Sequence, residues 1–290
     1  MRAALLLLAF AVPASAQFSN FDDEFLLLKA RFDQVRVKAA PAGLSPDEAK
    51  AAVKAKLAGS GVPDSYVDAA FADPRGKLFP EIPPKFGTPT TPVPATPYDQ
   101  YRKYFVTDKN LNDGVAFIRA NRALLQAVEA KYHVDGTLLV GLICVETKYG
   151  TAAGKYPVFD ALNTIVQKVP QRSNWAAREL AEYLKMTYAQ GMDTRGTLGS
   201  YAGAFGFVQF EPSTYGPTAV DFDGDGQRRL DQWPDALGSA ANYLAKSGYD
   251  ARDPFTAGSR IGRSLFSYNH SDNYVQVILD LREELLKRNP

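Results

Sequence analysis

The chain has 290 residues, of which 46% are hydrophobic and 12% aromatic, and it carries 33 basic and 32 acidic side chains. This hydrophobic content can form a substantial core, and it excludes a chain that is disordered throughout. The near balance of charge gives no electrostatic reason to expect nucleic acid or an anionic membrane as a partner. With two histidines and one cysteine, Cys144, the sequence excludes a histidine-rich metal site and an intramolecular disulfide.

Residues 1–16 have the three parts of a secretory signal peptide. Arg2 supplies the positive end, residues 3–12 the apolar segment, and residues 14–16 the small-residue cleavage site. The apolar segment is too short to anchor the chain across a bilayer, and the cleavage site has no cysteine for lipid attachment. We therefore expect an exported protein without a transmembrane segment, cleaved after Ala16 and located in the periplasm or secreted.

Residues 17–79 are expected to form an N-terminal helical region. Residues 18–37 have apolar side chains at helical spacing. A second helix is expected to begin at Ser45, because Ser45, Pro46 and Glu48 make a capping box with proline at the first helical position. That helix is expected to end near Leu57, and a short helix to follow over residues 64–71. The proline-rich stretch 80–97 should be extended, either as a passive linker or, as we favour, as a strap lying over the next domain.

Residues 98–290 form the main domain of a chain that we expect to be mainly α-helical. One acidic, glycine-containing loop interrupts it at residues 220–232, and a glycine-rich segment at residues 194–206 is expected to carry a small irregular or β element. No internal repeat or phosphate-binding order of glycines is present. The helices are expected over residues 98–105, 110–132, a central stretch after Asp135, 160–167, 173–192, 236–247, 259–268 and 273–288.

The central stretch, residues 138–150, contains the first candidate for chemistry. Its helix would be apolar on every side, which is typical of a buried helix. Glu146 follows on the same face as Leu139, Leu142 and Ile143. An ionisable group in that position is costly unless it is paired, neutralised or used. From this stretch alone, a structural carboxylate in a hydrogen-bond network and a catalytic acid are equally good interpretations.

Several blocks between residues 98 and 286 occur in the order typical of one enzyme family. The sequence there resembles the B-type lytic murein transglycosylases, and the resemblance fades upstream of the proline-rich stretch. It implies a lysozyme-like helical fold that cleaves the β-1,4 bond between N-acetylmuramic acid and N-acetylglucosamine of peptidoglycan glycan strands, without water, leaving 1,6-anhydro-muramoyl ends. The blocks are VETKYG (145–150), FDAL (159–162), GSYAGAFG (199–206), QFEPSTY (209–215), VDFDGDG (220–226), ALGSAANY (236–243) and YNHSDNYV (268–275).

The resemblance assigns the family's single catalytic carboxylate to Glu146. The acid must hold its proton near neutral pH, and burial among apolar side chains is expected to raise its pKa. After bond cleavage the same carboxylate would accept the proton of the muramoyl C6 hydroxyl. The substrate's acetamido group is thought to stabilise the intermediate, so neither a second carboxylate nor a cofactor is required. A hydrolytic muramidase and a catalytically weak peptidoglycan-binding module are the alternatives.

The resemblance also implies a set of substrate-binding residues. Aromatic rings would stack on sugar faces, and amides would hold acetamido or hydroxyl groups. Arg172 matches one of two adjacent arginines suited to a substrate carboxylate, and the other position is Gln171 here. A packing role remains the alternative for each tyrosine. The matching residues are Ser200, Gln209, Tyr243, Tyr268, Asn269, Arg172 and Trp175.

The acidic loop begins like an EF-hand, with oxygen ligands at alternate positions. The twelfth position, which normally supplies a bidentate glutamate, is Gln232. The alternative is an Asp/Gly turn that binds no metal. We favour a structural Ca²⁺ site with the candidate ligands Asp221, Asp223, Asp225, Gln227 and Asp231.

Overall fold

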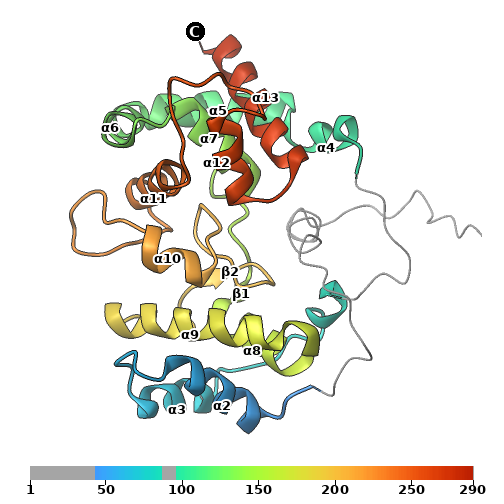
Figure 1. Ribbon diagram of the computed structural model, residues 1–290, viewed down its shortest axis with the longest axis vertical. Helices are drawn as coiled ribbons and strands as arrows, with labels where there is room; N and C mark the ends of the chain where they lie inside the picture. The colour runs from blue at the N-terminus through green and yellow to red at the C-terminus, as the bar shows by residue number, and fades with distance from the viewer. Residues whose placement is uncertain (1–42, 87–95, 290) are drawn as a thin grey trace, which may run out of the picture.

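The computed structural model describes residues 43–86 and 96–289. The predicted signal peptide, the predicted helix 18–37 and the middle of the proline-rich stretch lie outside the described residues. Within them the chain is mainly α-helical, as predicted, and its helices stack in successive layers along the long axis (Figure 1). None of the helices in these ranges combines the length and apolar character needed to cross a membrane.

The observed helices follow the predicted order with two differences. The predicted helical stretch 110–132 is divided at Asn121, and the short helix α10 was not predicted, because its Pro212, Gly216 and Pro217 read as a turn. The helices are α2 (Pro46–Leu57), α3 (Asp64–Ala72), α4 (Tyr98–Phe105), α5 (Asp108–Ala120), α6 (Arg122–Tyr132), α7 (Gly136–Thr147), α8 (Val158–Lys168), α9 (Ser173–Gln190), α10 (Pro212–Thr218), α11 (Trp233–Lys246), α12 (Arg260–Tyr268) and α13 (Asp272–Arg288), with 3₁₀ helices η2 (Pro83–Phe86) and η3 (Pro170–Arg172).

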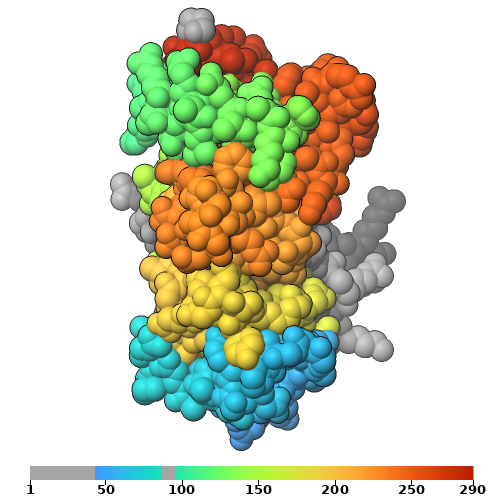
Figure 2. All heavy atoms as spheres, turned by 90° about the vertical axis from the view of Figure 1, so that its left-hand side faces the viewer, coloured from blue at the N-terminus to red at the C-terminus, as the bar shows by residue number. Residues whose placement is uncertain are grey.

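The lower layers contain α2 and α3, packed against α9 (Figure 2). The predicted capping box is present at the start of α2: the Glu48 amide donates to Ser45 Oγ at 3.3 Å, and Glu48 Oε2 accepts from the Ser45 amide at 2.8 Å. The hydroxyl of Tyr66 in α3 donates to Thr187 Oγ1 of α9 at 2.9 Å. The N-terminal helices are therefore joined to the rest of the chain by specific contacts. The predicted domain boundaries at residues 79 and 97 stay a prediction.

A buried arginine makes a second connection between these layers. Arg195 donates through Nε to Asp160 Oδ1 of α8 at 3.1 Å and through Nη1 to the carbonyl of Ala70 in α3 at 2.9 Å. Its guanidinium also lies 4.5 Å from the ring centre of Phe159. Because these partners lie on α3 and α8, Arg195 holds the two helices and its own loop together.

The described part of the proline-rich stretch lies against the main domain. Ile82 is fully buried, and the Gln171 amide of η3 donates to the carbonyl of Phe86 at 3.0 Å. Lys85 lies over the ring of Tyr201 in the glycine-rich segment, 5.2 Å from its centre. The Phe86 ring meets the same tyrosine edge to face, with centroids 5.5 Å apart.

The upper bundle surrounds α7, which is the central helix of the fold (Figure 1). It packs against α5, α6, α11 and α13, and its side chains from Leu138 to Thr147 are buried, as its apolar sequence predicts. Gly141 permits the close approach of α13, since a Cβ there would lie 3.2 Å from the Ile278 carbonyl oxygen. The Asp135 side chain caps the start of α7 by accepting from the Leu138 amide at 2.7 Å.

A small β element lies between the upper bundle and the lower layers, in the region where the sequence predicts one. Strand β1 (Tyr156–Pro157) pairs antiparallel with β2 (Leu198–Gly199). Phe205 makes isolated bridges to Gly199 and Phe210. These pairings fold the glycine-rich segment back beside the chain that leaves α7, so the two segments can share one site.

Candidate active site

The site is built around Glu146, the second-last residue of α7. Its side chain is 2% exposed. Tyr274 of α13, which is fully buried, donates its hydroxyl to Glu146 Oε1 at 2.6 Å. A carboxyl group at the end of a buried apolar helix therefore has a phenol as a direct hydrogen-bond partner, contributed by α13, which packs against α7.

Three tyrosines surround this carboxyl group. Burial raises the pKa of Tyr101, Tyr268 and Tyr274, and the negative charge of Glu146 raises each further. The phenols therefore remain protonated over the physiological range, and they can act as hydrogen-bond donors to a carboxylate but not as bases. The hydroxyl of Tyr268 donates to the Val208 carbonyl at 2.5 Å, which links α12 to the glycine-rich segment.

An aromatic row leads from a half-buried position to Glu146. Tyr243 of α11 contacts Tyr268 with ring centres 4.8 Å apart, and Tyr268 stacks on Tyr274 at 6.3 Å. Tyr243 is the most exposed of the three, and its hydroxyl donates to the Ser267 carbonyl at 2.6 Å. The structure thus brings the two predicted sugar-binding tyrosines together beside the predicted acid.

Ser200 and Gln209 lie in the folded glycine-rich segment, and both are buried. The Oγ of Ser200 accepts from the amides of Ala202 and Ala204, at 3.3 and 3.1 Å. Gln209 has a positive φ of 48°, and its side-chain amide donates to the carbonyls of Ala153 and Gly206. Both side chains therefore stabilise the conformation of the loop through hydrogen bonds to its backbone. Their role in substrate binding stays a prediction.

The other predicted substrate residues are distributed over two layers. Asn269 is buried directly after α12, next to Tyr268 in the chain. Arg172 and Trp175 lie at the junction of η3 and α9, in the layer formed by α8 and α9. The upper bundle, which contains α7, and the layer of α8 and α9 lie on opposite sides of the β element (Figure 1), so these two residues belong to a different layer from α7.

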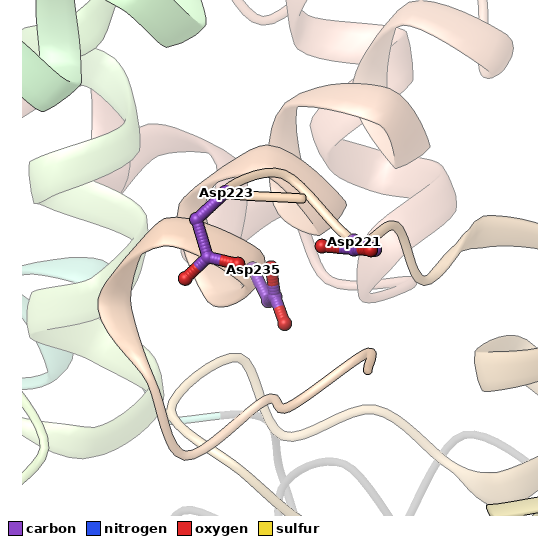
Figure 3. A group of neighbouring side chains, drawn as sticks. All are labelled: Asp221, Asp223 and Asp235. Carbon is purple, nitrogen blue, oxygen red and sulfur yellow. The ribbon is translucent and has the colours of Figure 1, made fainter. Parts of the chain in front are cut away.

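The acidic loop gathers a carboxylate cluster that only partly matches the predicted set. Asp221 and Asp223 lie together with Asp235, and one oxygen atom from each lies within 4.8 Å of the others (Figure 3). Asp225, Gln227 and Asp231 are exposed, and Asp225 lies 3.7 Å from the guanidinium of Arg229. Their place as ligands stays a prediction, and Asp235 was not among the predicted ligands.

Asp235 belongs to the first turn of α11 and is almost fully buried. Its two oxygens accept from the amides of Phe222 and Arg229, at 2.7 and 2.6 Å, which close the loop onto the helix. Burial raises the pKa of Asp235, and the negative charges of Asp223 and Asp221 act in the same direction. The cluster therefore accumulates negative charge that a cation would neutralise.

The cluster fits a calcium ion by its chemistry and spacing. Calcium prefers oxygen ligands at about 2.3–2.6 Å, so two ligands on opposite sides of the ion are about 5 Å apart. Oxygens that all lie within 4.8 Å of one another can share such an ion. The backbone of the loop holds one of these ligands in place, because the amides of Gly224, Asp225 and Gly226 all donate hydrogen bonds to the carboxylate of Asp221.

Sequence reasoning missed three residues that the structure places at these sites. Tyr274 is in the block YNHSDNYV, and Tyr101 is on the buried face of α4 with Phe105. Both were recognisable as buried aromatics, but their contact with Glu146 depends on helix packing. Asp235 had a local signal: it follows Pro234 at a helix start, where acidic residues are favoured.

A chain of this architecture, with a buried glutamate ending its central helix, has the fold of the lysozyme-like transglycosylases. The comparisons with known proteins agree. The family described as "Transglycosylase SLT domain" matches residues 45–265, and the chain belongs to this family.

The similar proteins include several lytic transglycosylases. The membrane-bound lytic murein transglycosylase B of Escherichia coli (strain K12) is 39% identical over 166 residues, which are 56% of this chain and 46% of the relative. This chain thus spans about half the length of that curated relative. The solved lytic transglycosylase SltB1 of Pseudomonas aeruginosa is 25% identical, with a TM-score of 0.78 over 85% of this chain and 99% of that one. An Escherichia coli lytic transglycosylase in complex with calcium shares the fold, at 24% identity and a TM-score of 0.74, over 88% of this chain and 99% of that one.

Proposed function

We propose that this protein is a peptidoglycan lytic transglycosylase that cleaves the β-1,4 bond between N-acetylmuramic acid and N-acetylglucosamine. The observation that carries the proposal is the Glu146 carboxyl group, which is buried at the end of α7 and hydrogen-bonded by Tyr274. Family membership and the names of the relatives support the same reaction.

In the first step Glu146 acts as the general acid. Its proton passes to the glycosidic oxygen as the bond from that oxygen to the muramoyl C1 breaks, so the N-acetylglucosamine side leaves as an alcohol. Removal from water favours the neutral form of a carboxyl group. The apolar walls of α7 therefore help Glu146 to hold the proton until a substrate accepts it.

In the second step the same residue acts as a base. The muramoyl acetamido oxygen shields the electron-poor C1, and the C6 hydroxyl of the same sugar then attacks C1 and displaces it. The hydroxyl proton passes to the Glu146 carboxylate, which restores the acid, and no water is consumed. Tyr274 supports the intervening state, because a phenol donor stabilises a carboxylate.

The glycan strand is proposed to lie along the aromatic row and the glycine-rich segment. Tyr243 and Tyr268 provide rings for sugar faces, while Ser200, Gln209 and Asn269 contribute polar groups. Arg172 and Trp175, in the lower layer, are proposed to hold more distant parts of the substrate. Gln171 has a neutral side-chain amide, which donates to the carbonyl of Phe86, and it supplies no charge to a peptide carboxylate.

Calcium is proposed as a structural ion, with no part in the reaction. Asp221, Asp223 and Asp235 would hold it. Its chemical contribution when bound is to neutralise their carboxylates. The protein itself joins the acidic loop to the start of α11 through Asp235, and Tyr243 lies further along the same helix.

The site of action is proposed to be the periplasm or the cell wall. The predicted signal peptide, cleaved after Ala16, would export the chain. The Escherichia coli relative is named as membrane-bound. Peptidoglycan is the proposed partner, because it contains the β-1,4 bond of the proposed reaction.

Digestion of purified peptidoglycan, followed by mass spectrometry of the products, tests the proposed reaction. Anhydro-muramoyl ends are the expected result, and the Glu146→Gln variant should release none. Reducing ends would instead assign a hydrolytic muramidase, and binding without soluble fragments would assign a peptidoglycan-binding module. Either result would refute the proposal.

A further inference from the structure

The backbone directly after Glu146 and Thr147 is strained. Lys148, Tyr149 and Gly150 follow one another with φ values of 47°, 59° and 83°. Two of these are not glycine, and L-residues rarely adopt this left-handed conformation. Strain of this kind persists only where the surrounding structure holds it, and it is concentrated at functional sites.

The first contact that holds the turn comes from Thr147, which is fully buried. Its Oγ1 accepts from the Gly150 amide at 3.1 Å, inside the turn. The same hydroxyl donates to the carbonyl of Phe207 at 3.0 Å, in the glycine-rich segment. One side chain thus closes the strained turn and fastens it to a segment some 60 residues further along the chain.

The partner segment is itself held firmly. The Phe207 amide donates to the Leu230 carbonyl at 2.7 Å, and its ring stacks on Trp233 with centres 4.0 Å apart. A Cβ at Gly150 would lie 3.0 Å from the Phe207 ring, so the turn and the aromatic pair are in close contact. Thr147 therefore ties the end of α7 to a rigid support.

Tyr149 supplies a second anchor on the opposite side. Its hydroxyl donates to the Asn110 carbonyl of α5 at 2.9 Å, and its ring stacks on Phe117 at 5.7 Å. Gly114 leaves room for it, since a Cβ there would lie 2.5 Å from the Tyr149 oxygen. The strained turn is thus held from the glycine-rich segment and from α5 at once.

We propose that Thr147 is a positioning residue for the reaction, with Tyr149 as its counterpart. Together they hold the final turn of α7 so that the neighbouring Glu146 carboxyl group stays aligned with Tyr274 and the substrate. This inference rests on the proposed function, because alignment has a measurable effect only if Glu146 transfers protons.

The test compares Thr147→Val and Thr147→Ser with a matched control, Thr164→Val. Thr164 is also fully buried, accepts from a backbone amide (Phe79, 3.1 Å) and donates to a backbone carbonyl (Asp160, 2.7 Å), but it lies in α8. Steady-state kinetics on soluble glycan strands should show kcat reduced about 10- to 100-fold in Thr147→Val with KM within about twofold. Thr147→Ser should recover most of kcat, and Thr164→Val should lower Tm by a similar amount while keeping kcat.

Equal kcat values per folded molecule in Thr147→Val and Thr164→Val would overturn the inference. If Thr147→Val does not fold, Tyr149→Phe replaces it, with Tyr66→Phe as control, since each loses one phenol hydrogen bond of 2.9 Å to a separate helix. A kcat loss confined to Tyr149→Phe supports the inference, and equal kcat values overturn it. A wild-type chain that produces no anhydro ends refutes the proposed function, whereas an active wild type with unaffected variants refutes only the positioning role.

Discussion

Two buried acids in different layers of the molecule have contrasting surroundings. Asp160, in α8, is bonded to the guanidinium of Arg195, and both side chains are at most 4% exposed. Glu146, in α7, is equally inaccessible, but Tyr274 donates to it and Tyr101 and Tyr268 lie close. Burial raises the pKa of Asp160, and the positive charge of Arg195 opposes that rise by favouring the carboxylate. A carboxyl group among phenols can change its protonation without breaking an ion pair. The contrast separates an acid that holds the fold from one that can perform chemistry.

The largest expected effect is on the acid among the phenols. Glu146→Gln keeps the shape of the side chain and an oxygen that can accept from Tyr274, but it cannot donate or accept the reaction's proton. General acid–base catalysis contributes about 10²- to 10⁴-fold per group, so product formation should fall by at least about a thousandfold when one residue serves both steps. Product release is measured by mass spectrometry and stability by thermal unfolding. A Gln variant that retains a tenth of the activity would contradict the assignment.

The acid paired with arginine should give the opposite result. Arg195→Ala leaves Asp160 buried without its cation, a change that costs about 3 kcal/mol or more of unfolding free energy. The activity per folded molecule should be retained. Denaturant unfolding measures the loss in Arg195→Ala and in Asp160→Asn, and the Asp160→Asn/Arg195→Ala double variant is the control, because removal of both charges should restore part of the stability. A double variant as unstable as the sum of the two single variants would show that the pair is not coupled.

The sequence predicts the burial of Glu146 but not the phenols that surround it. Apolar spacing over residues 138–146 is a local pattern, so it was sufficient to predict α7 and the burial of Glu146. The capping box of α2 was predictable for the same reason, since Ser45 and Glu48 interact within one turn. Tyr274 is 128 residues away from Glu146. Its role depends on how α13 packs on α7, which no local pattern specifies.

The acidic loop shows a second limit of sequence reasoning. The alternating aspartates at 221 and 223 follow a known loop pattern, which made them predictable. The pattern expects a glutamate at its twelfth position, which is Gln232 here. The third acid of the cluster is instead Asp235, three residues further on, which lies beside the loop because it is in the first turn of α11.

Helix α10 was missed for a related reason. A proline at its first position and two further helix-breaking residues are typical of a turn, yet packing against α9 makes the segment helical.

A smaller effect is expected from the phenol that distinguishes the Glu146 region. Tyr274→Phe removes the 2.6 Å hydrogen bond to Glu146 but keeps the ring. A hydrogen bond to a charged group contributes about 1.5–3 kcal/mol, so kcat should fall about 10- to 100-fold. Tyr215→Phe, which loses a buried phenol bond to the Arg228 carbonyl at 2.8 Å, should keep kcat. A Tyr274→Phe variant with unchanged kcat would show that the phenol is only a packing group.

The smallest effect concerns the third group of acids, which is neither paired with arginine nor surrounded by phenols. Asp221, Asp223 and Asp235 stand close together, so a cation should stabilise them. With a Kd of about 0.1 mM, 1 mM calcium would add about 1.4 kcal/mol, or roughly 2–4 °C in Tm. Thermal unfolding with calcium and with a chelator measures this difference, which should vanish in Asp235→Asn and Asp225→Ala if both residues are ligands. Because Asp235 also accepts from two backbone amides, the comparison is the calcium-dependent shift rather than the absolute Tm. If the calcium-dependent Tm shift is kept in Asp235→Asn but lost in Asp225→Ala, the ion binds at the exposed part of the loop. Asp235 is then a structural acid, like Asp160.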